Sequence, residues 1–259
     1  RMIKEELLVK INKNNVANIK KVGDQFLNHS YDPNNEYSVP YMWGTVGIIY
    51  NTAMLDDYPE SWADLWDEKY KGQIIMYNSQ RDALAVGLRK LGYSLNSRDE
   101  RELEEAKVEL IKQKPLVYAY MGDEIKDAMI SGEAAIAVVY SGDAVYMKWQ
   151  NPDLEYIIPS EGTNLWFDAM VIPNNAQNKD AAEKFIDFMT RPDIAAKNAE
   201  YIGYSSPIPE AVTLLDKEVQ SDPVAYPSDE DIKNTEVFND VIDVIHIYDR
   251  IWTEIMSAE

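Results

Sequence analysis

The chain has 259 residues, of which 46% are hydrophobic and 27% charged, and its formal net charge is −20 at pH 7. This length is sufficient for one large domain or for two lobes with separate cores. The negative charge argues against nucleic acid as a partner, since phosphate binding requires clustered Lys and Arg, and it favours the approach of a cationic ligand. The absence of cysteine excludes disulfides, thiolate metal sites and Cys nucleophiles.

Several other kinds of site lack their sequence signatures. His29 and His246 lie far apart in the sequence, and neither has a second ligand at metal spacing, so we expect no zinc site. The glycine patterns of nucleotide-binding loops and the Gly-x-Ser-x-Gly elbow of hydrolases are missing, and we expect no cofactor. We find neither a signal peptide nor an apolar run of about 18 residues that would span a membrane. The sequence opens at Arg1 in what reads as the middle of a helix, so we expect a longer natural protein.

The first part of the chain is predicted to contain a helix, a loop and a strand. Residues 2–11 place apolar side chains at helical spacing. Residues 31–37 are rich in turn formers and predict a loop. Residues 38–51 predict a buried strand in their second half, and the Trp-Gly-Thr sequence at 43–45 interrupts this stretch where a chain could cross between lobes.

The middle of the chain alternates strands with helices. Ser61 with Asp64, and Ser97 with Glu100, each match a capping box at the start of a helix. Apolar periodicity and the positions of Gly and Pro predict the other elements: a strand at 73–77, a helix that ends at 91, a helix after the second box that stops at 114–115, a helix from 121 to 132, and a strand from 133 that runs into a glycine turn at 142.

The last third of the chain continues this alternation. Strands are predicted at 154–159 and 165–173, followed by an amphipathic helix at 180–189 and a helix from Pro192 to a Gly203 cap. One face of the amphipathic helix carries Ala182, Phe185, Ile186 and Met189. The remainder is predicted to be helical with acidic loops. Strands that alternate with helices of this length predict an α/β fold with a largely parallel sheet.

Two side chains in the 165–173 strand point to a ligand site. Trp166 and Asp168 are two residues apart, so an extended strand directs them to the same face. A carboxylate beside an indole suits an organic cation, because the carboxylate pairs with an ammonium while the ring covers its methylene groups. The alternative is a Trp packed in the core at a sheet edge with a solvated Asp beside it.

A second polar group follows the strand at 73–77. Residues 78–82 lie where a strand passes into a helix, and ligands of α/β proteins bind at the carboxyl ends of strands. Asp82 in this segment, paired with Asp168, would also be compatible with the acid/base pair of a glycoside hydrolase. The sequence contains six Trp and 17 Tyr, which is enough to line a cleft with aromatic rings.

Several collinear segments resemble the solute-binding proteins of bacterial spermidine/putrescine ABC transporters, over nearly the whole chain. The matching segments are Asp32-Pro33-Asn34-Asn35, Val39-Pro40-Tyr41-Met42-Trp43-Gly44, Ser61-Trp62-Ala63-Asp64-Leu65-Trp66, Leu88-Arg89-Lys90-Leu91-Gly92-Tyr93-Ser94, Trp166-Phe167-Asp168, Arg191-Pro192-Asp193 and Ile202-Gly203-Tyr204. This resemblance implies a two-lobed periplasmic-binding-protein-like fold of type II. It places residues 1–44 and 167–212 in the first lobe and residues 45–166 and 213–259 in the second. It also implies that the first lobe is incomplete in this chain, without its amino-terminal part.

The resemblance assigns roles to individual residues. Trp166 corresponds to a tryptophan that packs on the polyamine methylenes, Asp168 to a carboxylate that binds a terminal ammonium, and Tyr204 to a tyrosine of the cleft. Asp82 stands where the family has a glutamate that binds the other amine end. The chain departs from the family pattern at three positions: Ser79 replaces an aspartate, Tyr140 a tryptophan and Phe238 a glutamine. The loss of a carboxylate and an amide puts the preferred polyamine in doubt.

These observations predict a binding protein and not an enzyme. We expect it to capture spermidine or putrescine between its lobes outside the cytoplasm, in the periplasm or on the outer face of the membrane, and to deliver the ligand to the permease of an ABC transporter. When intact it would be anchored to the membrane. Two alternatives stay open: a binder of another solute on the same fold, favoured by the changes at Ser79 and Phe238, and a carboxylate-pair hydrolase that uses Asp82 and Asp168.

Overall fold

Two sets of segments make up the protein in its computed structural model, which describes residues 1–258. Unit 1 consists of Arg1–Gly44 and Trp166–Tyr226, and unit 2 consists of Thr45–Leu165 and Pro227–Glu259. Residues 213–226, which the sequence prediction assigned to the second lobe, thus belong to unit 1. The identification of these units with two ligand-binding lobes stays a prediction.

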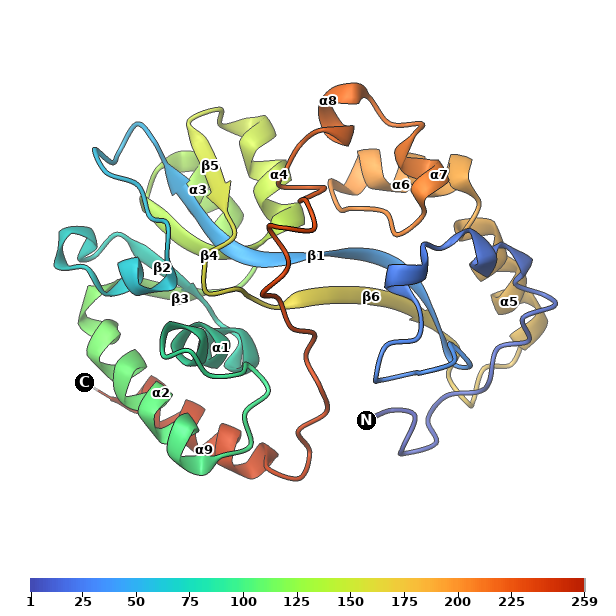
Figure 1. Ribbon diagram of the computed structural model, residues 1–259, viewed down its shortest axis with the longest axis horizontal. Helices are drawn as coiled ribbons and strands as arrows, with labels where there is room; N and C mark the ends of the chain where they lie inside the picture. The colour runs from blue at the N-terminus through green and yellow to red at the C-terminus, as the bar shows by residue number, and fades with distance from the viewer. Residues whose placement is uncertain (259) are drawn as a thin grey trace. The chain divides into compact units, whose positions relative to one another are not determined.

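The sheet of unit 2 is mixed. Its strand order is β3-β2-β4-β1-β5 (Figure 1). The strands are β1 (Ser38–Asn51), β2 (Ile74–Tyr77), β3 (Val117–Met121), β4 (Ile136–Tyr140) and β5 (Leu154–Ile157). Strand β2 runs parallel to β3 and β4, whereas β1 runs antiparallel to both of its neighbours, β4 and β5. The prediction of an α/β fold is confirmed, and four of these five strands run in one direction, but the sheet is mixed because β1, which comes from unit 1, enters against them.

Helices cover both faces of this sheet (Figure 1). On one side α1 (Gln80–Lys90), α2 (Glu100–Gln113) and α9 (Ile245–Ser257) pack against one another. On the other side lie α3 (Ile125–Ser131) and α4 (Ser141–Gln150). Three short 3-10 turns complete unit 2: η3 (Trp62–Trp66), η4 (Glu68–Tyr70) and η5 (Lys114–Leu116). Trp62 and Tyr248 are among the largest fully buried side chains, so η3 and α9 both contribute to the core.

The first of the two predicted capping boxes is confirmed and the second is wrong. Ser61 accepts a hydrogen bond at the start of η3 while Asp64 bonds back to the backbone of Ser61. At the second position the helix begins at Glu100, two residues later than the box requires. Asp99 is therefore the N-cap, and Ser97 instead donates from its hydroxyl to Glu102 at 2.5 Å.

Strand β1 is continuous through the Trp-Gly-Thr sequence that we expected to interrupt it. The division between the units nevertheless falls at this point, between Gly44 and Thr45. Further along, β1 approaches β5 closely: a Cβ on Gly47 would lie 2.3 Å from the carbonyl oxygen of Ile157. The glycine turn predicted at Gly142 is wrong, because Gly142 lies inside α4.

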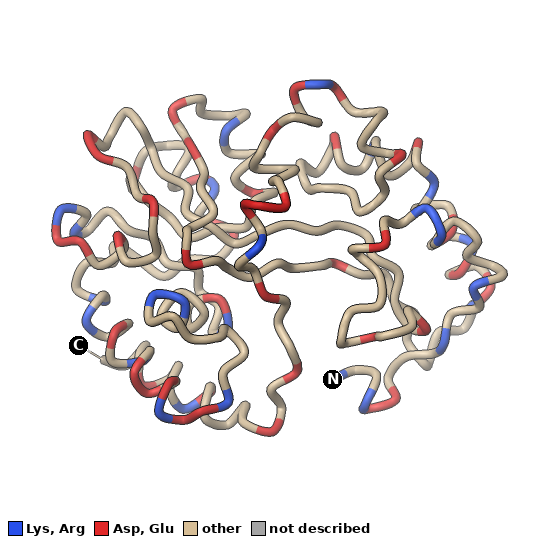
Figure 2. Tube along the Cα trace, viewed as in Figure 1, with Lys and Arg blue, Asp and Glu red and all other residues tan. Residues whose placement is uncertain are grey.

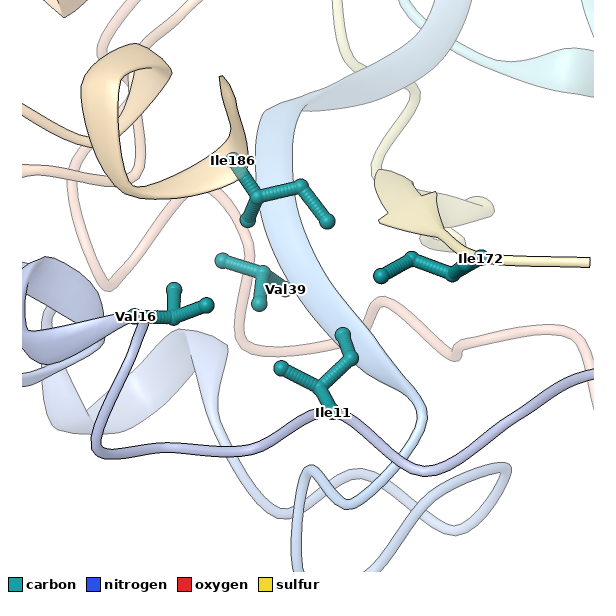
Figure 3. Close-up of a cluster of buried hydrophobic side chains, with 5 residues drawn as sticks. All are labelled: Ile11, Val16, Val39, Ile172 and Ile186. Atoms are coloured by element: carbon teal, nitrogen blue, oxygen red, sulfur yellow. The ribbon is translucent and has the colours of Figure 1, made fainter. Parts of the chain in front are cut away.

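Unit 1 has its own apolar core. Five buried side chains, Ile11, Val16, Val39, Ile172 and Ile186, meet there from four parts of the chain (Figure 3). Its elements are η1 (Ala17–Lys21), η2 (Asp24–Phe26), the first half of β1, β6 (Leu165–Val171), which pairs with β1, α5 (Lys179–Met189), α6 (Pro192–Ile202), α7 (Pro209–Val212) and α8 (Lys217–Gln220). Gly203 ends α6 in the left-handed conformation, as predicted.

Two predictions for unit 1 fail. Residues 2–11 form turns and an extended segment, not a helix: Val9 donates from its backbone to Ile172 at 3.0 Å, and Leu8 forms an antiparallel bridge with Pro173. The apolar spacing arose because Ile11 and its neighbours pack into the core from an extended chain. On α5 the predicted apolar face is only partly buried, since Phe185 remains 59% exposed.

The last part of the chain is less helical than predicted. Residues 221–244 contain turns and irregular segments, and only α9 follows them. The carboxyl end of α9 is held by Lys114, which donates to the carbonyl oxygens of Ile255 (3.0 Å) and Met256 (2.8 Å). Acidic residues are spread along both units and outnumber basic ones (Figure 2).

Candidate functional site

The part of the candidate site in unit 1 is built on β6. Trp166 is partly buried, and its ring packs on the ring of Tyr204, with a centroid distance of 5.3 Å and an angle of 57°. The intervening Phe167 turns the other way and contacts Phe26 and His29, at 6.1 and 4.2 Å between ring centroids. This alternation agrees with Trp166 and Asp168 sharing one face of the strand. Trp166 is not among the fully buried residues of the core, which favours the ligand-facing role over the alternative of a core tryptophan.

Asp168 is an exposed carboxylate with an aromatic hydroxyl nearby. Partial burial raises the pKa of Asp168 above its ordinary value. The pKa of Tyr41 is also raised, first by burial and then by the charge of Asp168. Tyr41 therefore belongs to the surroundings of Asp168, although we had noted it only as part of a matching segment. Tyr41 is distinguished by its partial exposure in an otherwise buried strand, and the sequence alone does not show this exposure.

The part of the candidate site in unit 2 lies where β2 and β4 end. These neighbouring strands are parallel, so the residues at their carboxyl ends meet at one edge of the sheet. Tyr77 ends β2, Tyr140 ends β4, and their ring centroids are 4.9 Å apart. Ser79 and Asp82 follow β2 in the first turn of α1. The structure thus brings together three of the predicted residues, Ser79, Asp82 and Tyr140, and adds Tyr77.

Asp82 is the central group of this cluster. It is 5% exposed, and its Oδ2 accepts a hydrogen bond of 2.9 Å from the hydroxyl of Tyr140. Burial raises the pKa of Asp82, against the smaller lowering effects of Ser79, Tyr140, the charge of Arg81, and Asn164. The second oxygen, Oδ1, is buried without a well-directed hydrogen bond from any residue in 1–258, although Ser79 and Asn164 are near enough to act on the carboxyl group.

Ser79 and Phe238 differ in what they contribute. Ser79 is the N-cap of α1, yet its side chain makes no capping hydrogen bond and acts on Asp82 instead. Phe238 lies against the guanidinium of Arg81, whose Cζ is 4.3 Å from the ring centroid. Arg81 also lies over the ring of Tyr248, at 5.1 Å. One face of Phe238 is therefore occupied by a cation of the protein itself.

The geometry within each unit suits cation binding. Unit 1 offers a carboxylate next to two packed aromatic rings, and unit 2 offers a buried carboxylate that accepts a hydrogen bond from an aromatic hydroxyl. A desolvated ammonium requires such a carboxylate, because an unpaired buried charge is costly. Within residues 1–258 no group of three His, Asp or Glu side chains is placed to hold a metal ion.

Comparison with known proteins identifies the family. The model of the family described as bacterial extracellular solute-binding protein matches residues 1–227. The chain belongs to this family. As a solute-binding protein it is similar to the spermidine/putrescine-binding periplasmic protein of Escherichia coli, with 38% identity over 100% of this chain and 74% of that protein. This confirms the resemblance seen in the sequence.

Solved structures of solute-binding proteins agree with the fold. The substrate-binding protein of a spermidine/putrescine ABC transporter from Streptococcus pneumoniae has 42% identity and a TM-score of 0.90, over 98% of this chain and 79% of that one. A lipoprotein of Treponema pallidum has 25% identity and a TM-score of 0.89, over 98% of this chain and 80% of that one. The mixed α/β architecture described above is thus that of a solute-binding protein.

Family membership also decides between two of the expectations. Solute-binding proteins serve transport outside the cytoplasm and are not enzymes, so the hydrolase alternative based on Asp82 and Asp168 is not favoured. None of the helices formed by residues 1–258 is long and apolar enough to cross a lipid bilayer. The contact of each predicted site residue with a ligand stays a prediction.

Proposed function

We propose that this solute-binding protein captures a polyamine, spermidine or putrescine, and delivers it to the permease subunits of an ABC transporter. The observation that carries the proposal is the pairing of Trp166 with Asp168 on β6, next to Tyr204. A polyamine consists of ammonium groups separated by methylene chains. The carboxylate of Asp168 takes a terminal ammonium, and the two rings cover the adjoining methylenes.

Unit 2 carries a second carboxylate suited to an ammonium group. Asp82 accepts an ammonium there, and Tyr140 and Ser79 hold the carboxyl group in place. The proteins from Escherichia coli and Streptococcus pneumoniae that resemble this chain are named for spermidine and putrescine, which supports the same ligand class. The loss of a carboxylate at Ser79 and the occupation of Phe238 by Arg81 favour a ligand with few charges, and putrescine has fewer than spermidine.

The location and partners follow from the same proposal. The ligand is captured in the periplasm or at the outer face of the membrane. Similarity to a lipoprotein of Treponema pallidum supports a membrane anchor on the intact protein. The strongly negative net charge of −20 raises the local concentration of polyamines at the protein surface.

Calorimetric titration with spermidine and putrescine tests the proposal. We expect binding in the micromolar range or tighter, and its loss in Asp168→Asn, which removes the charge but keeps the size of the side chain. The matched control is Asp193→Asn, which removes one exposed charge of the same unit from an ion pair with Arg191. Asp193→Asn is expected to bind as the unmodified protein does. Absence of heat with both amines would overturn the proposal, and a wider panel of amines and amino acids would then identify the solute.

A further inference from the structure

Asn164 is a buried polar residue next to Asp82 that the predicted site does not include. Its side chain is 4% exposed. Like Tyr140 and Ser79, it has a lowering effect on the pKa of Asp82. Asp82 and Asn164 line one small cavity of unit 2, together with Ala85, Val86 and other residues. Two polar side chains that are both more than nine-tenths buried thus face the same enclosed space.

The backbone around Asn164 is fixed from two sides. Val46 of β1 donates to the carbonyl oxygen of Asn164 at 3.1 Å, and Asn164 forms a parallel bridge with Glu236. Val46 is also the residue of β1 that pairs with Tyr140 of β4. Asn164 and Tyr140 therefore flank the same position of β1, where Tyr140 bonds to Asp82 and Asn164 lines the same cavity as Asp82. Little conformational freedom is lost when Asn164 contacts the carboxyl group.

The carboxyl group determines which end of the amide faces it. An ionised carboxylate accepts hydrogen bonds only, so an interaction of Asn164 with ionised Asp82 requires its NH₂ group to be directed toward that carboxyl group. The carbonyl oxygen Oδ1 of Asn164 is then directed away, and it is buried without a hydrogen-bond partner among residues 1–258. A buried acceptor without a partner is unfavourable, so the amide is expected to have a compensating interaction on its NH₂ side.

The charged neighbours of Asp82 do not replace this interaction. Arg89 lines the same cavity, but its guanidinium pairs with Glu236 at 2.8 Å and donates to the carbonyl oxygen of Asn234 at 2.9 Å. Arg81 acts on Asp82 through its charge and lies against Phe238. The other titratable groups that face Asp82 are Tyr140 and Tyr77.

We propose that Asn164 is a positioning residue for the ligand-binding carboxylate of Asp82, which it orients through its amide NH₂ group. The proposal rests on the polyamine-binding function proposed above. Asn164 acts on the ammonium of the ligand through Asp82 and not by direct contact. It is thereby a further determinant of the affinity of this protein for a cationic solute and of the pH range in which the solute is retained.

The test compares Asn164→Leu, which removes the donor at similar volume, with Asn51→Leu. Asn51 is a buried asparagine of the same unit, at the opposite end of the β1–β4 pairing from Tyr140, and its Oδ1 accepts from the backbone of Ala53 at 2.9 Å. Putrescine is titrated calorimetrically across the acidic and neutral range. The ionisation of Asp82 is followed in parallel by the infrared band of its protonated carboxyl group, assigned by its loss in Asp82→Asn.

In Asn164→Leu the pH midpoint of the infrared titration of Asp82 is expected to rise by about one unit. At pH values below that midpoint, the affinity for putrescine is expected to be about tenfold lower than in the unmodified protein. Asn51→Leu is expected to change neither the infrared midpoint nor the pH dependence of putrescine affinity, even where it lowers the unfolding temperature. An unchanged midpoint in Asn164→Leu, or an equal shift in Asn51→Leu, would overturn the role of Asn164. Should Asn164→Leu fail to fold, Asn164→Asp has nearly the same shape and is expected to raise the midpoint further, because two carboxylates would then be adjacent.

These outcomes are distinct from failure of the proposed function. If the unmodified protein bound neither putrescine nor spermidine, the polyamine proposal would fall while the infrared titration, which requires no ligand, would still measure the effect of Asn164 on Asp82. If the protein bound putrescine and Asn164→Leu retained the unmodified pH profile, the polyamine proposal would stand and the role of Asn164 would fall.

Discussion

The hydroxyl group of Tyr140 donates a hydrogen bond of 2.9 Å to Oδ2 of Asp82, which joins the last residue of β4 to the first turn of α1. A hydrogen bond from a neutral donor to a carboxylate stabilises the ionised form. It is thus compatible with the use of a buried carboxyl group to bind a cation.

Removal of this hydroxyl group is expected to weaken polyamine binding. Tyr140→Phe keeps the ring and its contact with Tyr77 but removes the donor. We expect a fall in putrescine affinity of roughly tenfold, because hydrogen bonds to charged groups contribute about 1.5–3 kcal/mol. Titration calorimetry measures the change. Tyr146→Phe, on an exposed tyrosine of α4, is the control, and equal affinities of the two variants would contradict the prediction.

Asp82→Asn is expected to abolish binding while it stabilises the ligand-free protein near neutral pH. Burial raises the pKa of Asp82, so the folded protein keeps a proton at pH values where the unfolded chain, with a value near 3.8, has lost it. The contribution of Asp82 to stability therefore decreases as pH rises from the unfolded value through the folded one, and is lowest above it. Asparagine does not ionise and avoids this decrease, while it still accepts a hydrogen bond from Tyr140.

Thermal unfolding without ligand checks this prediction. At about pH 8 the variant is expected to be more stable by about 1 kcal/mol, or about 3 °C for a chain of this size. As the pH falls through the raised pKa of Asp82, the difference is expected to shrink, because Asp82 becomes protonated in the unmodified protein as well. A variant that is less stable at every pH would show that the carboxylate stabilises the fold.

Trp166→Ala is expected to remove most of the apolar contact with the ligand. The indole packs on Tyr204 and is only partly buried, so its loss should change binding more than stability. We expect affinity for putrescine to fall roughly tenfold to a hundredfold. Trp149→Ala, at a tryptophan of α4 that is 49% exposed, is the control and is expected to bind as the unmodified protein does. Normal binding by Trp166→Ala would show that the indole of Trp166 does not contact the ligand.

Gly47→Ala is expected to destabilise unit 2. The added Cβ would lie 2.3 Å from the carbonyl oxygen of Ile157 and 2.5 Å from the ring of Tyr156, so β1 and β5 would have to separate. Such overpacking costs about 1–3 kcal/mol, and a lower denaturant midpoint would report it. Gly122→Ala places its Cβ only near the flexible side chain of Glu124 and is expected to be nearly neutral. A small effect at Gly47 would show that the strands separate easily.

The sequence predicted local signals well where neighbouring residues decide the structure. The capping box of Ser61, the left-handed Gly203 and the alternation of Trp166, Phe167 and Asp168 are all set by residues adjacent in the chain. The match to solute-binding proteins likewise rested on short collinear segments.

Features that depend on distant residues were missed. The direction of β1, the extended form of residues 2–11 and the position of Asn164 are determined by partners far along the chain. The apolar spacing of residues 2–11 fits a helix, and only the bridge to Pro173 reveals an extended segment. Nothing in the sequence near Asn164 shows that its side chain lies beside Asp82, 82 positions earlier by number. The pairing of strands provides that information.

The position of α9 has a consequence for the order in which the protein folds during synthesis. Tyr248, Ile251 and Ile255 are fully buried, and they come from the last helix of a unit that begins at Thr45. The apolar surfaces of α1 and α2 against which α9 packs are made long before it. Unit 2 therefore stays open on one side until α9 has been synthesised, and until then the growing chain exposes the apolar surfaces of α1 and α2.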